Sequence, residues 1–296
     1  MKAAILGING YIGRHLGHFL SDKGWTLYGF DIAKETVIEN IPYQSLDVLK
    51  SIDYEGLNTD IDFIFYFSGI TGTTKAYRDY NSFIDVNEKG LLNLLNRLRQ
   101  NNSKARVVFP STRLVYKGEK DNPLKEGAEK EFKTIYALNK WFGECALRQY
   151  TQYFGINHTI FRICVPFGSF LGRDYSYGTI GFFLKKAMNK ENIVLFGTGD
   201  QKRTFSHVED ICRQIHLALL NESSLNEVYN IGGETYSLKN IADKIAEKYQ
   251  VQVELAEWPE IDLKLESGDT IFDSSKITNL IQEPLKNNFN SWLSSI

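Results

Sequence analysis

The sequence contains three cysteines, and none of them has the C-x-x-C spacing of a metal or redox site: Cys145, Cys164 and Cys212. An odd number without that spacing argues against a disulfide framework or a zinc site and favours the reducing cytoplasm. An excess of one charge sign is also missing, because 34 basic residues face 36 acidic ones. A net charge of −2 gives no general attraction to nucleic acid or to an anionic membrane.

Long apolar runs are absent as well. No window approaches the roughly 18 consecutive apolar residues that cross a bilayer. The start, MKAAILGINGYIG, has the length of a short signal segment, but glycines interrupt it and no cleavage site follows, so a buried strand is the better interpretation. We therefore expect a cytoplasmic protein without membrane or nucleic-acid partners. At 296 residues, the chain can form one large α/β unit or two domains.

Apolar, β-rich runs alternate with helical patterns along the first 168 residues. Continuous apolar strands separated by helices are typical of a parallel sheet covered on both faces. The sequence thus predicts an α/β fold with a doubly wound parallel sheet. The expected strands are 3–8, 25–31, 62–69, 105–112 and 157–168, and the expected helices are 11–24, 80–102 and 134–154.

Beyond Gly168 this alternation loosens into glycine-rich, aromatic loops and short elements. We expect a first domain of residues 1–165 and a smaller C-terminal α/β domain of residues 166–296, some of whose segments return to the first. The loop that contains Tyr175 and Tyr177 either closes over a ligand or carries ordinary loop aromatics. A basic amphipathic helix is expected over 182–192.

A glycine-rich segment, Gly7-Ile8-Asn9-Gly10-Tyr11-Ile12-Gly13, follows the first predicted strand and opens a helix. Such glycines let the backbone approach a pyrophosphate, which binds the N–H groups at the helix start. Asp31 ends the second strand, 24 residues after Gly7. Its carboxylate can accept hydrogen bonds from ribose hydroxyls and repel a 2′-phosphate, which favours NAD over NADP. Arg14 beside the loop leaves NADP open.

A second pattern, Tyr136-Ala137-Leu138-Asn139-Lys140, lies within a predicted helix. Residues four apart lie one turn from each other on the same helix face. The pair is therefore either an ordinary surface contact or part of a catalytic site.

These two patterns together resemble the extended short-chain dehydrogenase/reductase superfamily, and within it the NAD-dependent epimerase/dehydratase family. The resemblance implies that Thr112 in PSTRLVYKG, Tyr136 and Lys140 are catalytic. It also implies a dinucleotide-binding first domain, a domain that mainly binds substrate, and a homodimer joined through helices 80–102 and 134–154. Apolar residues on those helices, such as Leu91, Leu95 and Phe142, would then include some left uncovered in the monomer.

Further positions follow from the same resemblance. The residues implied to bind the cofactor are Gly7, Gly10, Tyr11, Ile12, Gly13, Asp31, Asp47, Ser68, Gly69, Asn87, Tyr136 and Lys140. The residues implied to contact the substrate, a nucleotide-diphosphate sugar, are Thr112, Val165 and Arg203. Arg203 matches the position that usually meets the diphosphate, and a guanidinium suits phosphate oxygens.

The chemistry implied by the resemblance is proton transfer coupled to hydride transfer. A tyrosine has a pKa near 10, which the Lys140 ammonium and an oxidised nicotinamide would lower. Tyr136 could then remove a proton from a sugar hydroxyl or return it to a ketone, while Thr112 holds the same oxygen.

The sequence departs from the family pattern at several positions. Arg113 and Leu114 stand where 4,6-dehydratases have an Asp-Glu pair, which makes water elimination an unfavourable assignment. Val165 replaces a common asparagine, and Glu266 lies where a second diphosphate-binding arginine is expected. Three hypotheses remain: a sugar-nucleotide epimerase, which we favour because Asp31 favours NAD, a 4-ketoreductase that uses NADH or NADPH, and a cofactor-binding regulator without turnover.

Overall fold

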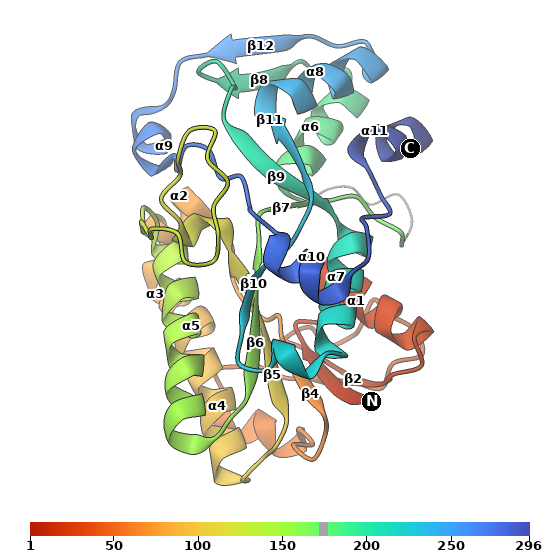
Figure 1. The fold of residues 1–296 in the computed structure, drawn as a ribbon, viewed down its shortest axis with the longest axis vertical. Coiled ribbons are helices and arrows are strands. Elements are labelled where there is room, and N and C mark those ends of the chain that lie inside the picture. The colour runs from red at the N-terminus through yellow and green to blue at the C-terminus, as the bar shows by residue number, and fades with distance from the viewer. Residues whose placement is uncertain (172–176) are drawn as a thin grey trace.

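A computed structural model describes residues 1–171 and 177–296 of the chain. Its centre is a seven-stranded sheet in the order β10-β6-β5-β4-β1-β2-β3, and every neighbouring pair is parallel (Figure 1). The strands are β1 (Lys2–Leu6), β2 (Thr26–Asp31), β3 (Tyr43–Ser45), β4 (Phe63–Tyr66), β5 (Arg106–Thr112), β6 (His158–Ile163) and β10 (Val228–Asn230). This is the predicted doubly wound arrangement, with the strand order of a dinucleotide-binding sheet.

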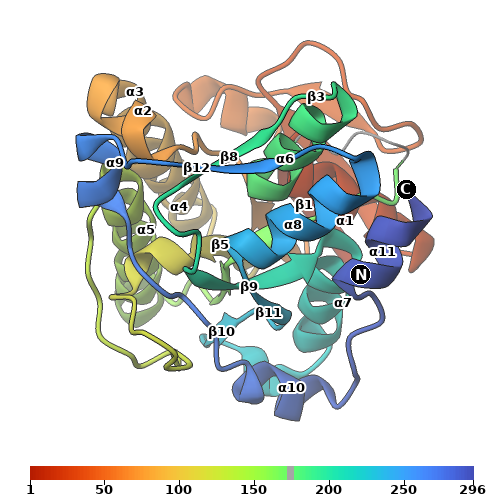
Figure 2. The same ribbon diagram turned by 90° about the horizontal axis from the view of Figure 1, so that it is seen from above.

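Helices cover both faces of this sheet, as Figure 2 shows from above. Helices α1 (Tyr11–Asp22), α7 (Val208–Leu219) and α10 (Ser275–Ile281) pack on one face. Helices α4 (Gly90–Gln100) and α5 (Ile135–Phe154) pack on the other, with α2 (Thr73–Arg78) and α3 (Tyr80–Ile84) beside them. Each face of the sheet therefore has its own apolar core. Because both faces of the strands are buried, their sequences are continuous apolar runs.

A smaller group of elements lies at one end of the large sheet, in the upper part of Figure 1. It contains a three-stranded sheet, β11-β9-β7, and a two-stranded sheet, β12-β8. The strands are β7 (Val165–Phe167), β8 (Ile193–Phe196), β9 (Lys202–His207), β11 (Glu234–Ser237) and β12 (Val253–Ala256). The helices are α6 (Gly178–Met188), α8 (Leu238–Tyr249), α9 (Glu260–Leu265) and α11 (Phe289–Ser295). A third apolar core joins most of these elements.

The two groups are interleaved along the sequence. Strand β10 and helix α7 belong to the C-terminal half, yet β10 pairs with β6 and α7 packs against α1. The functional division at residue 165 stays a prediction.

Two expected elements differ from the structure. The single strand predicted over 157–168 is split at Cys164 into β6 and β7, which belong to different sheets. The helix predicted over 80–102 is interrupted by a π-helical turn, Asp85–Lys89, between α3 and α4. Such turns insert one residue into the helical ladder and occur often at functional sites. Short 3₁₀ segments complete the chain at Ser51–Gly56, Arg113–Val115 and Glu222–Ser224.

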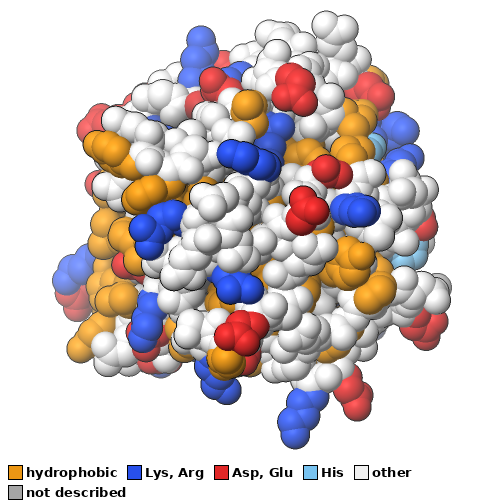
Figure 3. Space-filling view, turned by 90° about the horizontal axis from the view of Figure 1, so that it is seen from below, with side chains coloured by type: hydrophobic (Ala, Val, Ile, Leu, Met, Phe, Trp, Pro, Cys, Tyr) orange, Lys and Arg blue, Asp and Glu red, His pale blue; other side chains and the backbone are white. Residues whose placement is uncertain are grey.

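The surface carries charges of both signs. On the face drawn in Figure 3, basic and acidic side chains are interspersed among polar and apolar ones. Within residues 1–171 and 177–296, we find no helix that is both long and apolar enough to cross a membrane.

Candidate active site

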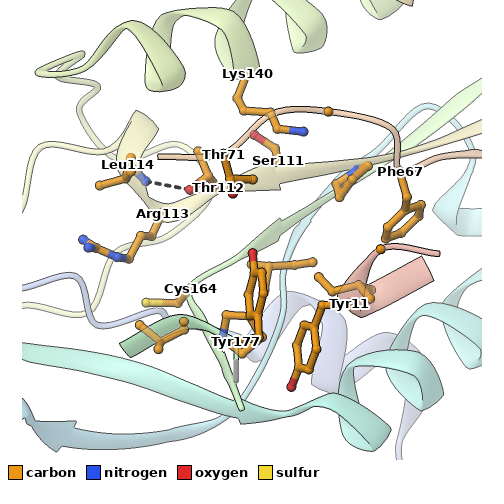
Figure 4. Close-up of a pocket in the computed structure, with 18 of the residues that line it drawn as sticks. Tyr11, Phe67, Thr71, Ser111, Thr112, Arg113, Leu114, Lys140, Cys164 and Tyr177 are labelled. Atoms are coloured by element: carbon orange, nitrogen blue, oxygen red, sulfur yellow. Dashed lines mark hydrogen bonds between the residues drawn. The ribbon is translucent and has the colours of Figure 1, made fainter. Parts of the chain in front are cut away.

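A cavity of about 450 Å³ opens where β1, β4, β5 and β6 end (Figure 4). Ligands of open parallel sheets bind at this edge, beside the carboxyl ends of the strands. The predicted residues that line the cavity are Gly7, Gly10, Tyr11, Ile12, Gly13, Gly69, Thr112, Tyr136, Lys140 and Val165. The structure therefore brings the glycine loop, the Tyr136–Lys140 pair and Thr112 to one place.

The glycine loop requires glycine for steric reasons. Gly7 has a φ of +85°, and a Cβ on Gly13 would lie 2.1 Å from the Gly7 carbonyl oxygen. A Cβ on Gly7 would lie 2.5 Å from the Ser68 amide nitrogen. Helix α1 begins directly after Gly10, and no side chain of the described residues caps it. These features fit a dinucleotide, because its pyrophosphate would accept from the amides at the helix start.

Asp31 lies beside this loop, at the end of β2. The Asn9 amide donates to its Oδ2 at 3.1 Å, and the Ala33 amide donates to its Oδ1 at 3.4 Å. The carboxylate is therefore held next to the glycine loop, where a nucleotide ribose would bind. Neither Asp31 nor Asp47 lines the cavity, and the Asp47 Oδ1 accepts from the Leu49 amide at 3.0 Å.

Asn87 supports the segment that contains Ser68 and Gly69. Its buried amide side chain accepts from the Ile70 amide at 2.8 Å and donates to the Ile70 carbonyl at 3.0 Å. The π-helical turn carries Asn87, so this turn and the β4 loop are joined at the cavity. A Cβ on Gly69 would lie 3.0 Å from the Asn87 Oδ1. Asn87 thus positions the loop whose residues were predicted to bind the cofactor.

The three predicted catalytic residues come from two elements. Thr112 is the last residue of β5, and its hydroxyl accepts from the Leu114 amide at 3.3 Å. Tyr136 and Lys140 lie in the first turns of α5, which the Thr134 hydroxyl caps by accepting from Ala137 at 3.0 Å. The Lys140 Nζ lies 5.9 Å from the centroid of the Tyr136 ring.

Burial governs how this pair titrates. It raises the pKa of the Tyr136 hydroxyl and lowers the pKa of Lys140 to about 8. The sequence analysis expected the Lys140 ammonium and an oxidised nicotinamide together to lower the tyrosine pKa. In the structure the ammonium lies 4.6 Å from the centroid of the Phe109 ring, so desolvation of both groups dominates. Lowering the tyrosine pKa would require the positive charge of an oxidised nicotinamide in the cavity.

Of the residues predicted to contact the substrate, Val165 lines the cavity and Arg203 does not. Val165, the first residue of β7, lines the cavity. Arg203 is 3% exposed and is not among the cavity-lining residues. Its Nη2 donates to both carboxylate oxygens of Glu266, at 2.8 and 3.0 Å. Its role as a diphosphate ligand stays a prediction.

Several further residues belong to the site. Arg113 and Cys164 line the cavity, and Figure 4 shows both near Thr112. Tyr177 also lines it and stacks on Tyr11, with ring centroids 4.3 Å apart, while Tyr175 lies outside the described residues. In the sequence, Arg113 stood out only as a departure from the family pattern. The residues that contact its side chain could not be predicted from the sequence.

Behind the cavity lies a buried charged network that the sequence analysis missed. Ser111 donates to Glu144 Oε1 at 2.6 Å, and Arg162 donates to both carboxylate oxygens of Glu144, at 2.8 and 2.6 Å. Arg148 adds a bond to Glu144 Oε2 at 2.9 Å. The network joins β5, α5 and β6 beside Thr112. One feature of the sequence could have pointed to this network: Glu144 is four residues after Lys140, so it lies one turn farther along the same helix.

The histidines have structural contacts. His15 bonds to the Tyr11 carbonyl at 2.7 Å and to the Ser169 hydroxyl at 3.1 Å, whereas His18 pairs with Asp22. The described residues contain no cluster of three or more His, Cys, Asp or Glu that could hold a metal ion.

Comparison with known proteins agrees with this geometry. The sequence model of the NAD dependent epimerase/dehydratase family matches residues 3–232. The CDP-paratose 2-epimerase of Salmonella typhi is 26% identical, and the alignment covers 95% of this chain and 94% of that protein. A dTDP-4-dehydro-6-deoxy-D-allose reductase from Streptomyces sp is also 26% identical, with coverage of 81% and 79%.

Solved structures share the fold. The UDP-glucose 4-epimerase of Thermus thermophilus, in a complex with NAD, superposes with a TM-score of 0.87 at 22% identity, and the match covers 99% of this chain and 96% of that one. Because the family pattern spans most of the chain, the protein belongs to the NAD-dependent epimerase/dehydratase family and is an enzyme of the extended short-chain dehydrogenase/reductase type.

Proposed function

We propose that this enzyme is a sugar-nucleotide epimerase that transiently oxidises a ring hydroxyl of its substrate. The observation that carries the proposal is the convergence of Thr112, Tyr136 and Lys140 with the glycine loop around one cavity. The epimerase among the relatives, which aligns over nearly its whole length, supports the same activity.

Each residue then has a defined part. NAD, when bound, would supply the hydride acceptor and later the donor. The Tyr136 phenolate takes the proton of the sugar hydroxyl, becomes the neutral phenol and later returns that proton, and the Thr112 hydroxyl binds the same oxygen. Lys140 orients the cofactor ribose and contributes positive charge near Tyr136. Val165 forms part of the wall that faces the sugar.

The remaining positions would hold the cofactor. The glycine loop with Tyr11 and Ile12 binds the pyrophosphate, Asp31 binds the adenosine ribose, and Asp47 binds the adenine. Ser68 and Gly69 border the dinucleotide, and Asn87 holds their loop through its two bonds to Ile70.

A 4-ketoreductase is the second candidate. The reductase from Streptomyces sp is as similar in identity as the epimerase from Salmonella typhi, at 26% each. Both reactions use Thr112, Tyr136 and Lys140 in the same roles. They differ in whether the nicotinamide returns to its starting state in every cycle.

An assay without added cofactor separates the two activities. The purified enzyme is incubated with a panel of sugar nucleotides, and the products are identified by NMR of the sugar ring. We expect an epimer of one substrate without net change in nicotinamide absorbance. Turnover that occurs only with 4-keto sugar nucleotides, and only after NADH or NADPH is added and consumed, would instead establish the reductase.

We further propose a homodimer in a reducing cytoplasm. Apolar side chains on α3 and α5 are exposed, among them Ile84 at 41% and Leu138 at 47%. Leu91 and Leu95, which the sequence suggested for this surface, are instead buried in the monomer. A protein that sediments as a monomer at all concentrations would contradict the dimer.

A further inference from the structure

Two arginines, Arg113 and Arg203, meet at the segment 266–270. Arg113 Nη1 donates to the Ser267 hydroxyl at 2.7 Å and to the Thr270 hydroxyl at 3.2 Å. Arg203 Nη1 donates to the same Thr270 hydroxyl at 3.3 Å. The two guanidinium groups therefore share one acceptor and lie close together.

One carboxylate, that of Glu266, lies against these two positive charges: it hydrogen-bonds to Arg203 and acts on Arg113 electrostatically without a hydrogen bond. Both oxygens of Glu266 accept from Arg203, and the pair is largely buried. Among the described residues, no carboxylate forms a hydrogen bond or an ion pair with Arg113. Its hydrogen bonds to described residues all come from Nη1 and end on hydroxyls, whereas a guanidinium has five N–H donors.

Arg113 is also the arginine that faces the cavity. It lines the cavity next to Thr112, while Arg203 does not. Burial and the charge of Arg203 lower the pKa of Arg113 to about 10, so the side chain still carries its charge at neutral pH. Two arginines beside one carboxylate leave a net positive charge, which an anion bound in the cavity would balance.

We propose that Arg113, rather than Arg203, binds the diphosphate of the substrate. This inference rests on the proposed function of a sugar-nucleotide enzyme. Figure 4 shows Arg113 extending from the end of β5 away from Lys140. A planar guanidinium binds phosphate oxygens through paired, charge-assisted hydrogen bonds.

The pairing of Arg203 with Glu266 explains why a second arginine is needed. A carboxylate that binds a guanidinium occupies the donors that phosphate would use and repels an incoming anion. Glu266 therefore withdraws Arg203 from the ligand, and Arg113 supplies the charge from the neighbouring strand end.

Equilibrium binding tests the assignment. The full-length protein, saturated with NAD, is titrated by calorimetry with UDP, CDP, dTDP, GDP and ADP. For whichever diphosphate binds, Arg113→Gln should weaken affinity by about 10- to 100-fold, the scale of a lost charged hydrogen bond. Arg113→Lys, which keeps the charge but not the fork, should weaken it less.

A matched control removes the neighbouring ion pair as a unit. The double variant Arg203→Gln/Glu266→Gln eliminates one positive and one negative charge together, and it should keep the affinity within about threefold. Affinity for NAD and the thermal unfolding midpoint show whether each variant is folded. If Arg113→Gln does not fold, the comparison of Arg113→Lys with the double variant carries the test.

The outcomes are distinct. Affinity for the diphosphate that is unchanged in Arg113→Gln overturns the inference and leaves the proposed function standing. Wild-type protein that binds NAD but none of the five diphosphates overturns the proposed function and the inference with it.

Discussion

Tyr136 lies in an environment that keeps it protonated. Burial raises the pKa of its hydroxyl, and the Lys140 ammonium contacts the ring of Phe109 rather than the tyrosine oxygen. In the proposed mechanism the tyrosine would become an effective base only in the assembled complex, where an oxidised nicotinamide would add positive charge. Such a site holds its proton until cofactor and substrate are both present.

Replacing Tyr136 by phenylalanine tests its role directly. Tyr136→Phe removes the proton-transferring hydroxyl, so turnover should fall by about 10² or more, while NAD binds nearly as before. Steady-state kinetics and NAD titration measure the two effects. The control is Tyr153→Phe on the same helix, where the side chain is 66% exposed. Wild-type turnover in Tyr136→Phe would refute the mechanism.

Asp31 should set the cofactor preference. In the wild-type protein the Asn9 amide nitrogen lies 3.1 Å from the Asp31 carboxylate. Asp31→Asn keeps an oxygen that can accept this bond but removes the negative charge that repels a 2′-phosphate. We expect weaker NAD binding and relaxed discrimination against NADP, measured by titration with both dinucleotides. An unchanged preference would assign the selection to another group, such as Arg14.

For individual residues, the sequence predicted those that belong to a short motif. Gly7, Gly13, Tyr136 and Lys140 belong to short segments, so their patterns could be found in the sequence, and the family resemblance then implied their roles. The contacts of Arg113 depend on the segment 266–270, more than 150 residues away. Ion pairing between distant segments leaves no periodic signal, which is why this environment emerged only from the structure.

Among the elements, β5, α5 and β6 are joined by the carboxylate of Glu144. It is fully buried and binds Ser111, Arg148 and Arg162. Because Ser111 precedes Thr112 and Glu144 lies one turn after Lys140, the network fixes the strand end relative to the helix. The relative position of two catalytic residues thus depends on a charge pair that touches neither.

The two arginines bound to Glu144 should differ in their contribution to stability. Arg162→Leu leaves a buried carboxylate without its main partner and should cost about 3–5 kcal/mol. Arg148→Leu removes a partner that is 40% exposed and should cost about 1 kcal/mol or less. Urea unfolding measures both. Equal losses for the two variants would show that burial does not decide the strength of these pairs.

The sequence predicted most elements because their apolar periodicity was strong. It did not predict that 157–168 would divide, because apolar residues continue on both sides of Cys164 and the division shows only in the strands with which β6 and β7 pair. The π-helical turn at Asp85–Lys89 was equally hidden. Its cause is tertiary, since Asn87 within it binds the backbone of the β4 loop.

For the whole molecule, two buried histidines should link stability to pH. His158 and His207 are 2% and 4% exposed, and burial lowers the pKa of each to about 4. Among the described residues, the Nε2 atoms of both have no hydrogen-bond partner. In the unfolded chain each imidazole takes up its proton near pH 6.5, while in the folded protein it stays neutral down to about pH 4.

Stability should therefore fall as the pH drops from 6.5 towards 4, because the unfolded state binds more protons in that window. The loss is on the order of 2 kcal/mol per histidine at pH 5. Urea unfolding at pH 7.5 and pH 5 measures it. His158→Gln, which does not titrate, should lose about 2 kcal/mol less than the wild type between these conditions. An identical loss in both proteins would rule out His158 as a source.

The cofactor that the molecule retains offers the most direct test of the epimerase assignment. The enzyme is purified without added nucleotide and denatured, and any released dinucleotide is identified by mass and absorbance. An epimerase returns its hydride in every cycle and keeps its cofactor, so we predict nearly one equivalent of NAD(H) per chain. Protein that releases no nicotinamide dinucleotide would contradict the proposal that this cavity holds NAD through turnover.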